Sequence, residues 1–303
     1  MKSQIKLAAL ALFLTTSSAH FSTALAQGDL TPSGPPAPTM KSLTQIEPRT
    51  DVLKLSGDAN YLYTITQPGA YYLTTNLVGI SGKGGIGILT NNVTVDLNGF
   101  SVVGVSGSFI GIRVPSGTNI AVRNGTISGW GNLGVSCADN VILEGLILSA
   151  NSFDGASCGN GALVRNCISS GNSYHGIVVS SNSVVSGCVV KNNGRIGISV
   201  NGSGCLIAEN VCFKNNTENL AAWANIRLDG SQNRVEGNHV TGPSVNGIYI
   251  PNLGIYTNNI FIKNSVSGDG ANNYNLPSLQ IVGPLINTTG TITNSNPWAN
   301  FSF

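Results

Sequence analysis

The sequence is poor in charged residues, and its longest apolar run lies at the N-terminus. Only 9% of its 303 residues are Asp, Glu, Lys or Arg, against roughly 25% in an average globular protein. An amphipathic helix needs a charged face, so this composition argues against a helical protein and favours stacked polar ladders. The net charge of +2 gives no electrostatic basis for binding nucleic acid or an anionic membrane.

The apolar N-terminal run is typical of a signal peptide. Lys2 and Lys6 form a basic region, residues 7–14 an apolar core, and Ala24-Leu-Ala26 a cleavage site with small residues. We therefore expect the mature chain to begin at Gln27 and to be secreted, periplasmic or held at the cell surface. No later run is long enough to cross a bilayer, so we expect no membrane-spanning segment.

A 21-residue repeat organises the middle of the chain. Its copies begin at Gly134, Gly155, Gly176 and Gly197, and each opens with a short apolar line that a polar bend follows. The apolar lines are rich in Val and Ile and broken by Gly, Asn and Ser, which leaves no room for helices. Strands that return at such an interval stack into a parallel β-helix, with each turn about 4.8 Å above the last.

We predict an all-β fold class, a single solenoid of about 8–9 turns with N- and C-terminal caps. After Gly197 the lines restart at Asn225, Gly247 and Asn275, with steps of 28, 22 and 28 residues. The insertion Thr217–Trp223 is the largest candidate for a functional loop. The predicted segments are a signal peptide (1–26), a Pro-rich leader (27–50), an N-terminal cap (51–84), the β-helix (85–290) and a C-terminal cap (291–303).

Strand alternation assigns the inward positions of the coil. One predicted core column is Ile112, Val135, Ala156, Ile177 and Ile198, and the next is Val114, Cys137, Cys158, Val179 and Val200. The six cysteines follow the spacing of the repeat, so core packing is their simplest role. A disulfide between neighbouring turns stays open for an exported protein.

Two further columns precede the strand lines and hold the candidate site. One contains Ile110, Leu133, Asp154, His175 and Ile196, and the other contains Phe109, Asn132, Phe153, Tyr174 and Arg195. Residues 21 apart stack directly, so the repeat places a carboxylate, an imidazole and a guanidinium within about 10 Å of one another. A predicted stack of two aromatic rings lies beside them.

These residue types suit the chemistry of acidic sugars. In the catalytic hypothesis, Asp154 orients the ring of His175, which acts as general base, and Arg195 binds the substrate carboxylate and stabilises an enolate. Such a site is that of a polysaccharide lyase or a uronate epimerase. The predicted substrate-binding residues are Phe153, Tyr174, Asn132 and Trp130. Two alternatives stay open: the column only stabilises the coil, or it binds without catalysis.

The other charged residues give weaker evidence for function than the candidate site does. Arg123, Glu144 and Arg165 form a ladder of alternating charge, which we interpret as structural ion pairing. Paired acids in adjacent turns and a His/Cys/Met cluster are both missing from the columns. This argues against a glycoside hydrolase and against calcium, copper or zinc sites. We predict no metal and no cofactor.

The Gly-Ile-x-Val lines, Pro68-Gly-Ala-Tyr-Tyr-Leu73, Val95-Asp-Leu-Asn-Gly-Phe100 and the Asn/Gly bends resemble secreted bacterial right-handed parallel β-helix proteins. These belong to the broad pectate-lyase-like superfamily. The resemblance covers about residues 60–290 and implies a right-handed coil. That superfamily includes polysaccharide lyases, epimerases, glycoside hydrolases, copper-site accessory proteins and non-enzymatic stalks.

Two functions follow from these observations. The first is an exported protein that binds, and as a lyase or epimerase modifies, an extracellular polysaccharide or cell-surface glycan. The second is a non-enzymatic structural or adhesive rod, with oligomerisation through the caps as a further option. The Asp154, His175 and Arg195 neighbourhood favours the first, and the low charge favours the second.

Overall fold

The computed structural model of the chain describes residues 46–242, 244–268, 272–287 and 291–303. The predicted signal peptide and most of the predicted Pro-rich leader lie outside these residues. The segment Pro48–Phe303 forms one compact unit. Among the described residues, no helix has the length and apolar character needed to cross a membrane.

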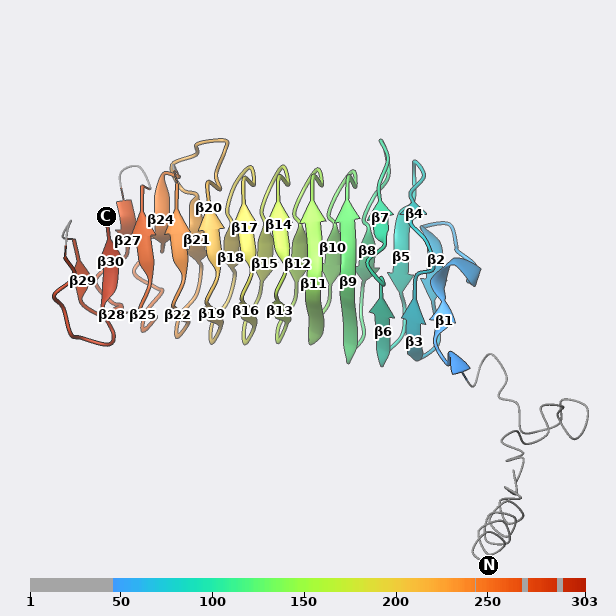
Figure 1. Cartoon of the computed structure of the whole chain (residues 1–303), viewed down its shortest axis with the longest axis horizontal. Coiled ribbons are helices and arrows are strands. Elements are labelled where there is room, and N and C mark those ends of the chain that lie inside the picture. Colours follow the sequence, from blue (N-terminus) through green and yellow to red (C-terminus); the bar gives the residue numbers. More distant parts are fainter. Residues whose placement is uncertain (1–45, 243, 269–271, 288–290) are drawn as a thin grey trace, which may run out of the picture. The chain divides into compact units, whose positions relative to one another are not determined.

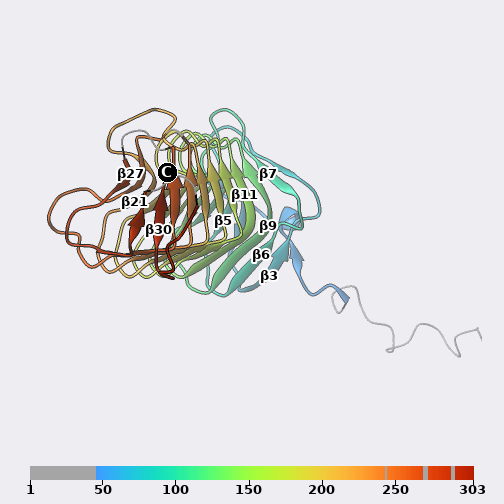
Figure 2. The ribbon, with the colours of Figure 1, turned by 60° about the vertical axis from the view of Figure 1, so that its left-hand side comes forward.

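This unit is a coil of short parallel strands (Figures 1 and 2). A 3-10 segment, η1 (Val52–Lys54), comes before the second strand. One sheet has ten strands, so the coil makes about ten turns rather than the predicted 8–9. Its strands, in spatial order, are β2 (Tyr61–Ile65), β5 (Gly84–Ile88), β8 (Ile112–Val114), β10 (Val135–Cys137), β12 (Ala156–Cys158), β15 (Ile177–Val179), β18 (Ile198–Val200), β21 (Ala224–Leu228), β24 (Asn246–Tyr249) and β27 (Asn272–Asn275).

The remaining strands form a twenty-stranded sheet, which we call the large sheet. They are β1 (Thr50–Asp51), β3 (Gly69–Tyr72), β4 (Leu77–Val78), β6 (Val93–Asp96), β7 (Ser101–Val103), β9 (Ile120–Ser128), β11 (Val141–Ser149), β13 (Leu163–Arg165), β14 (Ile168–Ser170), β16 (Val184–Ser186), β17 (Val189–Lys191), β19 (Leu206–Ala208), β20 (Val211–Phe213), β22 (Arg234–Glu236), β23 (His239–Thr241), β25 (Ile260–Ile262), β26 (Ser265–Ser267), β28 (Ile281–Val282), β29 (Leu285–Ile286) and β30 (Asn300–Ser302).

The 21-residue register is confirmed in the ten-stranded sheet. Val135 pairs with Ile112 and Ala156, and the column continues through the next two turns. Cys137 pairs with Cys158 in the second predicted column. The last step is shorter than predicted, because Tyr249 pairs with Asn275, which makes that turn 26 residues long.

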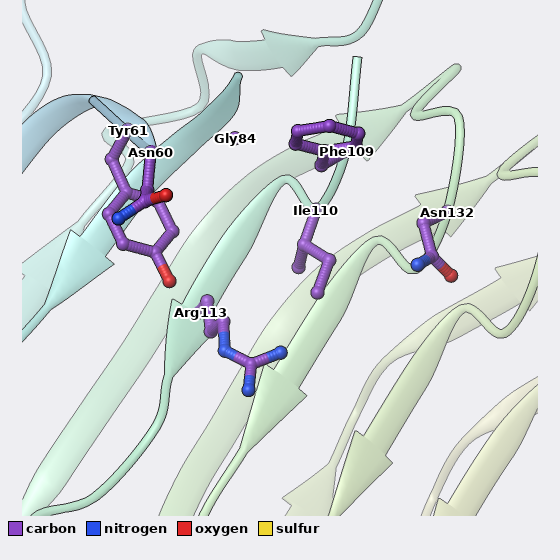
Figure 3. A pocket seen from close by; sticks show the side chains of 7 residues that line it. All are labelled: Asn60, Tyr61, Gly84, Phe109, Ile110, Arg113 and Asn132. Carbon is purple, nitrogen blue, oxygen red and sulfur yellow. The ribbon is translucent and has the colours of Figure 1, made fainter. Parts of the chain in front are cut away.

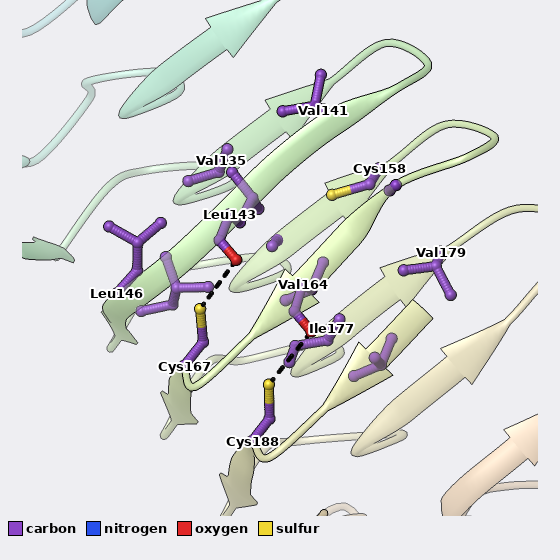
Figure 4. Close-up of a cluster of buried hydrophobic side chains, with 14 of the residues drawn as sticks. Val135, Val141, Leu143, Leu146, Cys158, Val164, Cys167, Ile177, Val179 and Cys188 are labelled. Carbon is purple, nitrogen blue, oxygen red and sulfur yellow. Dashed lines mark hydrogen bonds between the residues drawn. The ribbon is translucent and has the colours of Figure 1, made fainter. Parts of the chain in front are cut away.

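The cysteines pack in the core, and no disulfide joins any two of them. Five are buried, and Cys137 is half-buried. The Sγ atoms of Cys167 and Cys188 lie 3.7 Å from the carbonyl oxygens of Leu143 and Val164 (Figure 4). They fill space between Val and Leu side chains as small apolar groups.

A ladder of buried asparagines fixes the bends before four consecutive strands of the ten-stranded sheet, β12, β15, β18 and β21. The side chain of Asn151 donates to Asn172 at 2.9 Å, Asn172 to Asn193 at 2.9 Å, Asn193 to Asn215 at 2.8 Å and Asn215 to Asn225 at 2.8 Å. The same acceptor oxygens also bind backbone N–H groups. Each turn is therefore joined to the next by side-chain hydrogen bonds as well as by the sheet.

The outer face of the ten-stranded sheet carries mostly small residues in its middle, with larger residues on either side. Strand alternation points the residue that follows the first core column in each strand away from the core. In register, these residues are Gly87, Arg113, Ser136, Ser157, Val178, Ser199, Arg227 and Tyr249. We call this row the outer strip.

Candidate functional site

The predicted column of Phe109, Asn132, Phe153, Tyr174 and Arg195 exists and lies beside the outer strip. Backbone hydrogen bonds of 2.8–3.2 Å link each residue to the one before it, from Asn132 to Arg195. We call this column the bend row. Its residues belong to the bends that lead into successive strands, so the coil itself sets their spacing.

Three side chains of the bend row form a continuous stack. The rings of Phe153 and Tyr174 are 4.2 Å apart between centroids and tilted by 14°. The Cζ atom of Arg195 lies 3.6 Å from the Tyr174 ring centroid. Phe153 is 37% exposed, and Tyr174 and Arg195 are half-buried. The stack thus combines flat apolar surface with one guanidinium group.

Asp154 lies one turn from His175, as predicted, but it does not orient the imidazole. Its Oδ1 accepts a hydrogen bond of 3.0 Å from the backbone N–H of His175. Burial raises the pKa of Asp154 to about 6, against the opposing effects of this hydrogen bond and of Arg195. Because Asp154 acts on the backbone, its predicted catalytic role is not supported by this geometry.

The imidazole of His175 is held by the next turn instead. Its Nδ1 accepts a hydrogen bond of 3.1 Å from the backbone N–H of Ile196. Burial lowers the pKa of His175 to about 4, helped by the charges of Arg195 and Arg227. At neutral pH the ring is therefore neutral with its proton on Nε2. Its basic nitrogen is already used, so the ring offers a hydrogen-bond donor and does not suit the general-base role.

The predicted insertion folds toward this stack and completes the cluster. Glu218 accepts a 3.0 Å ion-pair hydrogen bond from Nε of Arg195. The Trp223 ring lies 5.5 Å from the His175 ring and 5.6 Å from the Cζ of Arg195. Asn216 fixes the loop through two hydrogen bonds to the backbone of Leu220, at 2.9 and 3.0 Å.

Sequence reasoning missed three residues that join the cluster from the outer strip and its edge. Arg227 binds Asp229 through two hydrogen bonds, at 2.8 and 2.9 Å. Its Cζ lies 5.2 Å from the Trp223 ring and 5.6 Å from the Tyr249 ring. The signal was present, since Arg227 and Tyr249 occupy the outward position of two consecutive strand lines. The columns read from sequence were those before the strands, those inside the core and one charge ladder, and none of them was the outer strip.

Two predicted binding residues are not part of the stack. Asn132 is exposed and sits in the bend row between Phe109 and Phe153. Trp130 is fully buried, and its Nε1–H donates to the carbonyl of Val102 at 3.0 Å. A Cβ atom at Gly79 would lie 2.9 Å from the Trp130 ring, so glycine makes room for it. Trp130 is therefore a core residue and cannot touch a ligand at the surface.

The charge ladder on the large sheet is only partly as predicted. Arg165 pairs with Glu144 at 2.9 Å, whereas Arg123 pairs with Asp96 at 3.2 Å. In the part of the chain that the structure describes, no three His, Cys, Asp or Glu side chains are grouped to hold a metal ion.

The cluster has little free charge. Both of its guanidinium groups, on Arg195 and Arg227, are matched by carboxylates, and its imidazole is neutral. It offers flat aromatic faces, the N–H of His175, and arginines that salt bridges hold in place.

Residues 155–296 match the family model of the right-handed β-helix region. Among solved structures, the chain is similar to the A-module of mannuronan C-5 epimerase AlgE6 from Azotobacter vinelandii, with 17% identity, a TM-score of 0.45, and coverage of 78% of this chain and 88% of that one. It is also similar to pectate lyase Pel9A, with 16% identity, a TM-score of 0.37, and coverage of 78% and 64%.

A third similar structure is the tailspike protein of E. coli bacteriophage HK620 in complex with a pentasaccharide. Its identity is 12% and its TM-score 0.38, and the match covers 75% of this chain and 47% of that one. No curated protein matches the sequence. The observed coil shows that residues 48–303 fold as a parallel β-helix, and residues 155–296 of this coil match the family model of a right-handed β-helix region.

Proposed function

We propose that the protein is an exported polysaccharide-binding protein whose glycan lies along the outer face of the ten-stranded sheet. One observation carries the proposal, namely the stack of Phe153, Tyr174 and Arg195 with Trp223 beside it. A sugar ring has a face of C–H groups, and these pack well on the electron-rich faces of aromatic rings. The coil repeats its turns at about 4.8 Å, so it offers an extended ligand a row of contacts.

Polar groups around the stack suit the hydroxyls of a sugar. The Nε2–H of His175 has no hydrogen-bond partner among the described residues, and it can donate to a hydroxyl or carboxylate oxygen. The salt bridge to Glu218 and the contact with Tyr174 hold Arg195 in position. Pre-ordered side chains lose less conformational entropy when a ligand binds.

The same geometry favours binding over catalysis. A lyase or an epimerase of uronic acids needs a base that removes a proton from carbon, and the neutral His175 has its free lone pair in a backbone hydrogen bond. Asp154 is buried, and one of its oxygens is engaged by the backbone. We expect uronate polymers incubated with the protein to show no rise in the absorbance of unsaturated products.

Isothermal titration against a panel of neutral and acidic polysaccharides tests this proposal. The double variant Phe153→Ala/Tyr174→Ala is expected to bind at least tenfold more weakly, because two ring contacts are lost. The matched control is Phe213→Ala, since Phe213 is 41% exposed but lies on β20 of the large sheet. Equal affinities for both variants would show that the stack is not the binding surface, and no binding to any polymer by the wild type would favour the structural rod.

A further inference from the structure

A pocket of about 400 Å³ lies at the N-terminal end of the bend row (Figure 3). Its volume is in the range of pockets that hold small ligands. It is separate from the stack described above. The lining residues are Asn60, Tyr61, Gly84, Phe109, Ile110, Arg113 and Asn132.

Arg113 is the exceptional residue of this pocket. The other six arginines all form salt bridges with carboxylates, at N–O distances of 2.7–4.0 Å. Arg113 has no ion pair and no hydrogen bond within the described residues, although it is half-buried. Its neighbours in the outer strip, Gly87 and Ser136, are small. The pocket therefore holds a guanidinium group whose donors are all available.

Two aromatic rings complete the pocket. The Tyr61 ring lies against two glycines, and a Cβ atom at Gly87 would be 2.5 Å from its Cδ2, and one at Gly84 would be 3.0 Å from its Cδ1. The absence of side chains at these positions thus lets the ring lie on the sheet next to Arg113. Phe109 is 53% exposed, and Figure 3 shows both rings and the guanidinium group around the same open space.

We propose that this pocket is the site at which the protein recognises an acidic sugar residue. The guanidinium group of Arg113 binds the planar carboxylate through two parallel hydrogen bonds, and the sugar ring packs against Tyr61 and Phe109. The amides of Asn60 and Asn132 supply partners for its hydroxyls. The inference rests on the proposed function, because it assumes that the polysaccharide bound at the stack also enters the pocket.

The position of the pocket supports a shared ligand. Phe109 and Phe153 belong to the same bend row and are two turns apart, which is about 10 Å. A chain that lies on the stack therefore reaches the pocket along the row. Arg195 and Arg227 cannot replace Arg113 in reading charge without giving up their carboxylate partners.

The test compares three probes on variants of the full chain. The probes are an oligogalacturonate, its methyl ester, and the same oligosaccharide with its carboxylates reduced to alcohols. The wild type is expected to bind the oligogalacturonate at least tenfold more tightly than the other two, because only its carboxylates accept two parallel charge-assisted hydrogen bonds from a guanidinium group. Arg113→Gln should lose this preference and keep its affinity for the ester. The control, Arg165→Gln, removes an exposed arginine of the large sheet and should change neither.

Each contrary result has a distinct meaning. The inference is overturned if Arg113→Gln behaves as Arg165→Gln does, or if the ester or the reduced probe binds as tightly as the oligogalacturonate. If Tyr174→Ala weakens binding while Arg113→Gln does not, only the pocket assignment is lost. If Arg113→Gln weakens binding while Tyr174→Ala does not, the stack is wrong and the pocket stands. Thermal unfolding of each variant checks that the coil is intact.

Discussion

The 21-residue turns between Gly134 and Gly197 and the 28-residue turn that follows Gly197 share one core but differ at the surface. The asparagine ladder passes from Asn193 through Asn215 to Asn225 with the same side-chain bonds as in the regular turns. Ile198 pairs with Ile226 as it does with Ile177. The extra residues go into the loop that carries Glu218 and Trp223, so the shared ladder keeps the register while the insertion builds the site.

The largest effect on stability is expected from breaking the asparagine ladder, which the two kinds of turn share. Asn193 is fully buried and is bonded to the turns before and after it. Asn193→Ala leaves several buried groups without partners, so it should lower the free energy of unfolding by about 3–5 kcal/mol. Urea unfolding measures this loss. Asn132→Ala, at an exposed position of the bend row, is the control, and a loss below about 1 kcal/mol for Asn193→Ala would contradict the role of the ladder.

The second prediction concerns the two ionisable groups of the regular turns. Because the pKa of Asp154 is raised from 3.8 to about 6, its stabilising contribution is complete below pH 4 and is lost as the pH rises to 6. The pKa of His175 is lowered from 6.5 to about 4, so its contribution is present above pH 6.5 and is lost as the pH falls to 4. Each amounts to roughly 3 kcal/mol, and the two oppose each other.

Single variants separate these contributions. Between pH 6.5 and pH 4, Asp154→Asn should lose stability relative to the wild type as the pH falls, and His175→Gln should gain it. Urea unfolding at several pH values gives both slopes. Parallel curves for the wild type and both variants would show that burial does not shift these groups as described.

The third prediction removes the contribution of the longer turn. Trp223→Ala deletes the ring near His175, Arg195 and Arg227. We expect polysaccharide affinity to fall about tenfold and the free energy of unfolding to fall by only about 1 kcal/mol, because the ladder is untouched. Titration calorimetry and urea unfolding measure the two effects. A stability loss as large as that of Asn193→Ala would mean that the insertion belongs to the core.

The smallest effect is expected from Glu218→Gln, which removes the carboxylate partner of Arg195 and so makes it comparable with the unpaired Arg113. The ion pair is exposed, so stability should change by less than about 1 kcal/mol. Arg195 then lacks its carboxylate partner, and oligogalacturonate should bind two- to threefold more tightly at low salt. A strong loss of binding would instead show that Glu218 itself contacts the ligand.

The sequence predicted the coil well because its information is periodic. The spacing of 21 gave the register of both core columns and of the bend row, including the stack of Phe153 and Tyr174. The resemblance gave the handedness. The repeat predicted the turn lengths after Gly197 less accurately, because the length of the last turn depends on the number of residues in its loops.

The details of the site depend on side-chain contacts, and these cannot be derived from the 21-residue repeat spacing. The 21-residue spacing predicted that Asp154 lies beside His175. Whether the Asp154 carboxylate binds the backbone N–H or the imidazole of His175 depends on the direction in which the bend points the carboxylate. Trp130 is in the core because glycines of neighbouring turns make room for it. Arg113 was visible in sequence, yet its lack of a partner emerges only when the partners of every other arginine are known.

Hydroxyl-radical footprinting in the presence of a bound polysaccharide tests the central claim most directly. We predict reduced oxidation at Phe153, Tyr174 and Trp223, and unchanged oxidation at Phe213 on the large sheet. Protection confined to the large sheet, or no protection of the three residues at saturating polysaccharide, would contradict it.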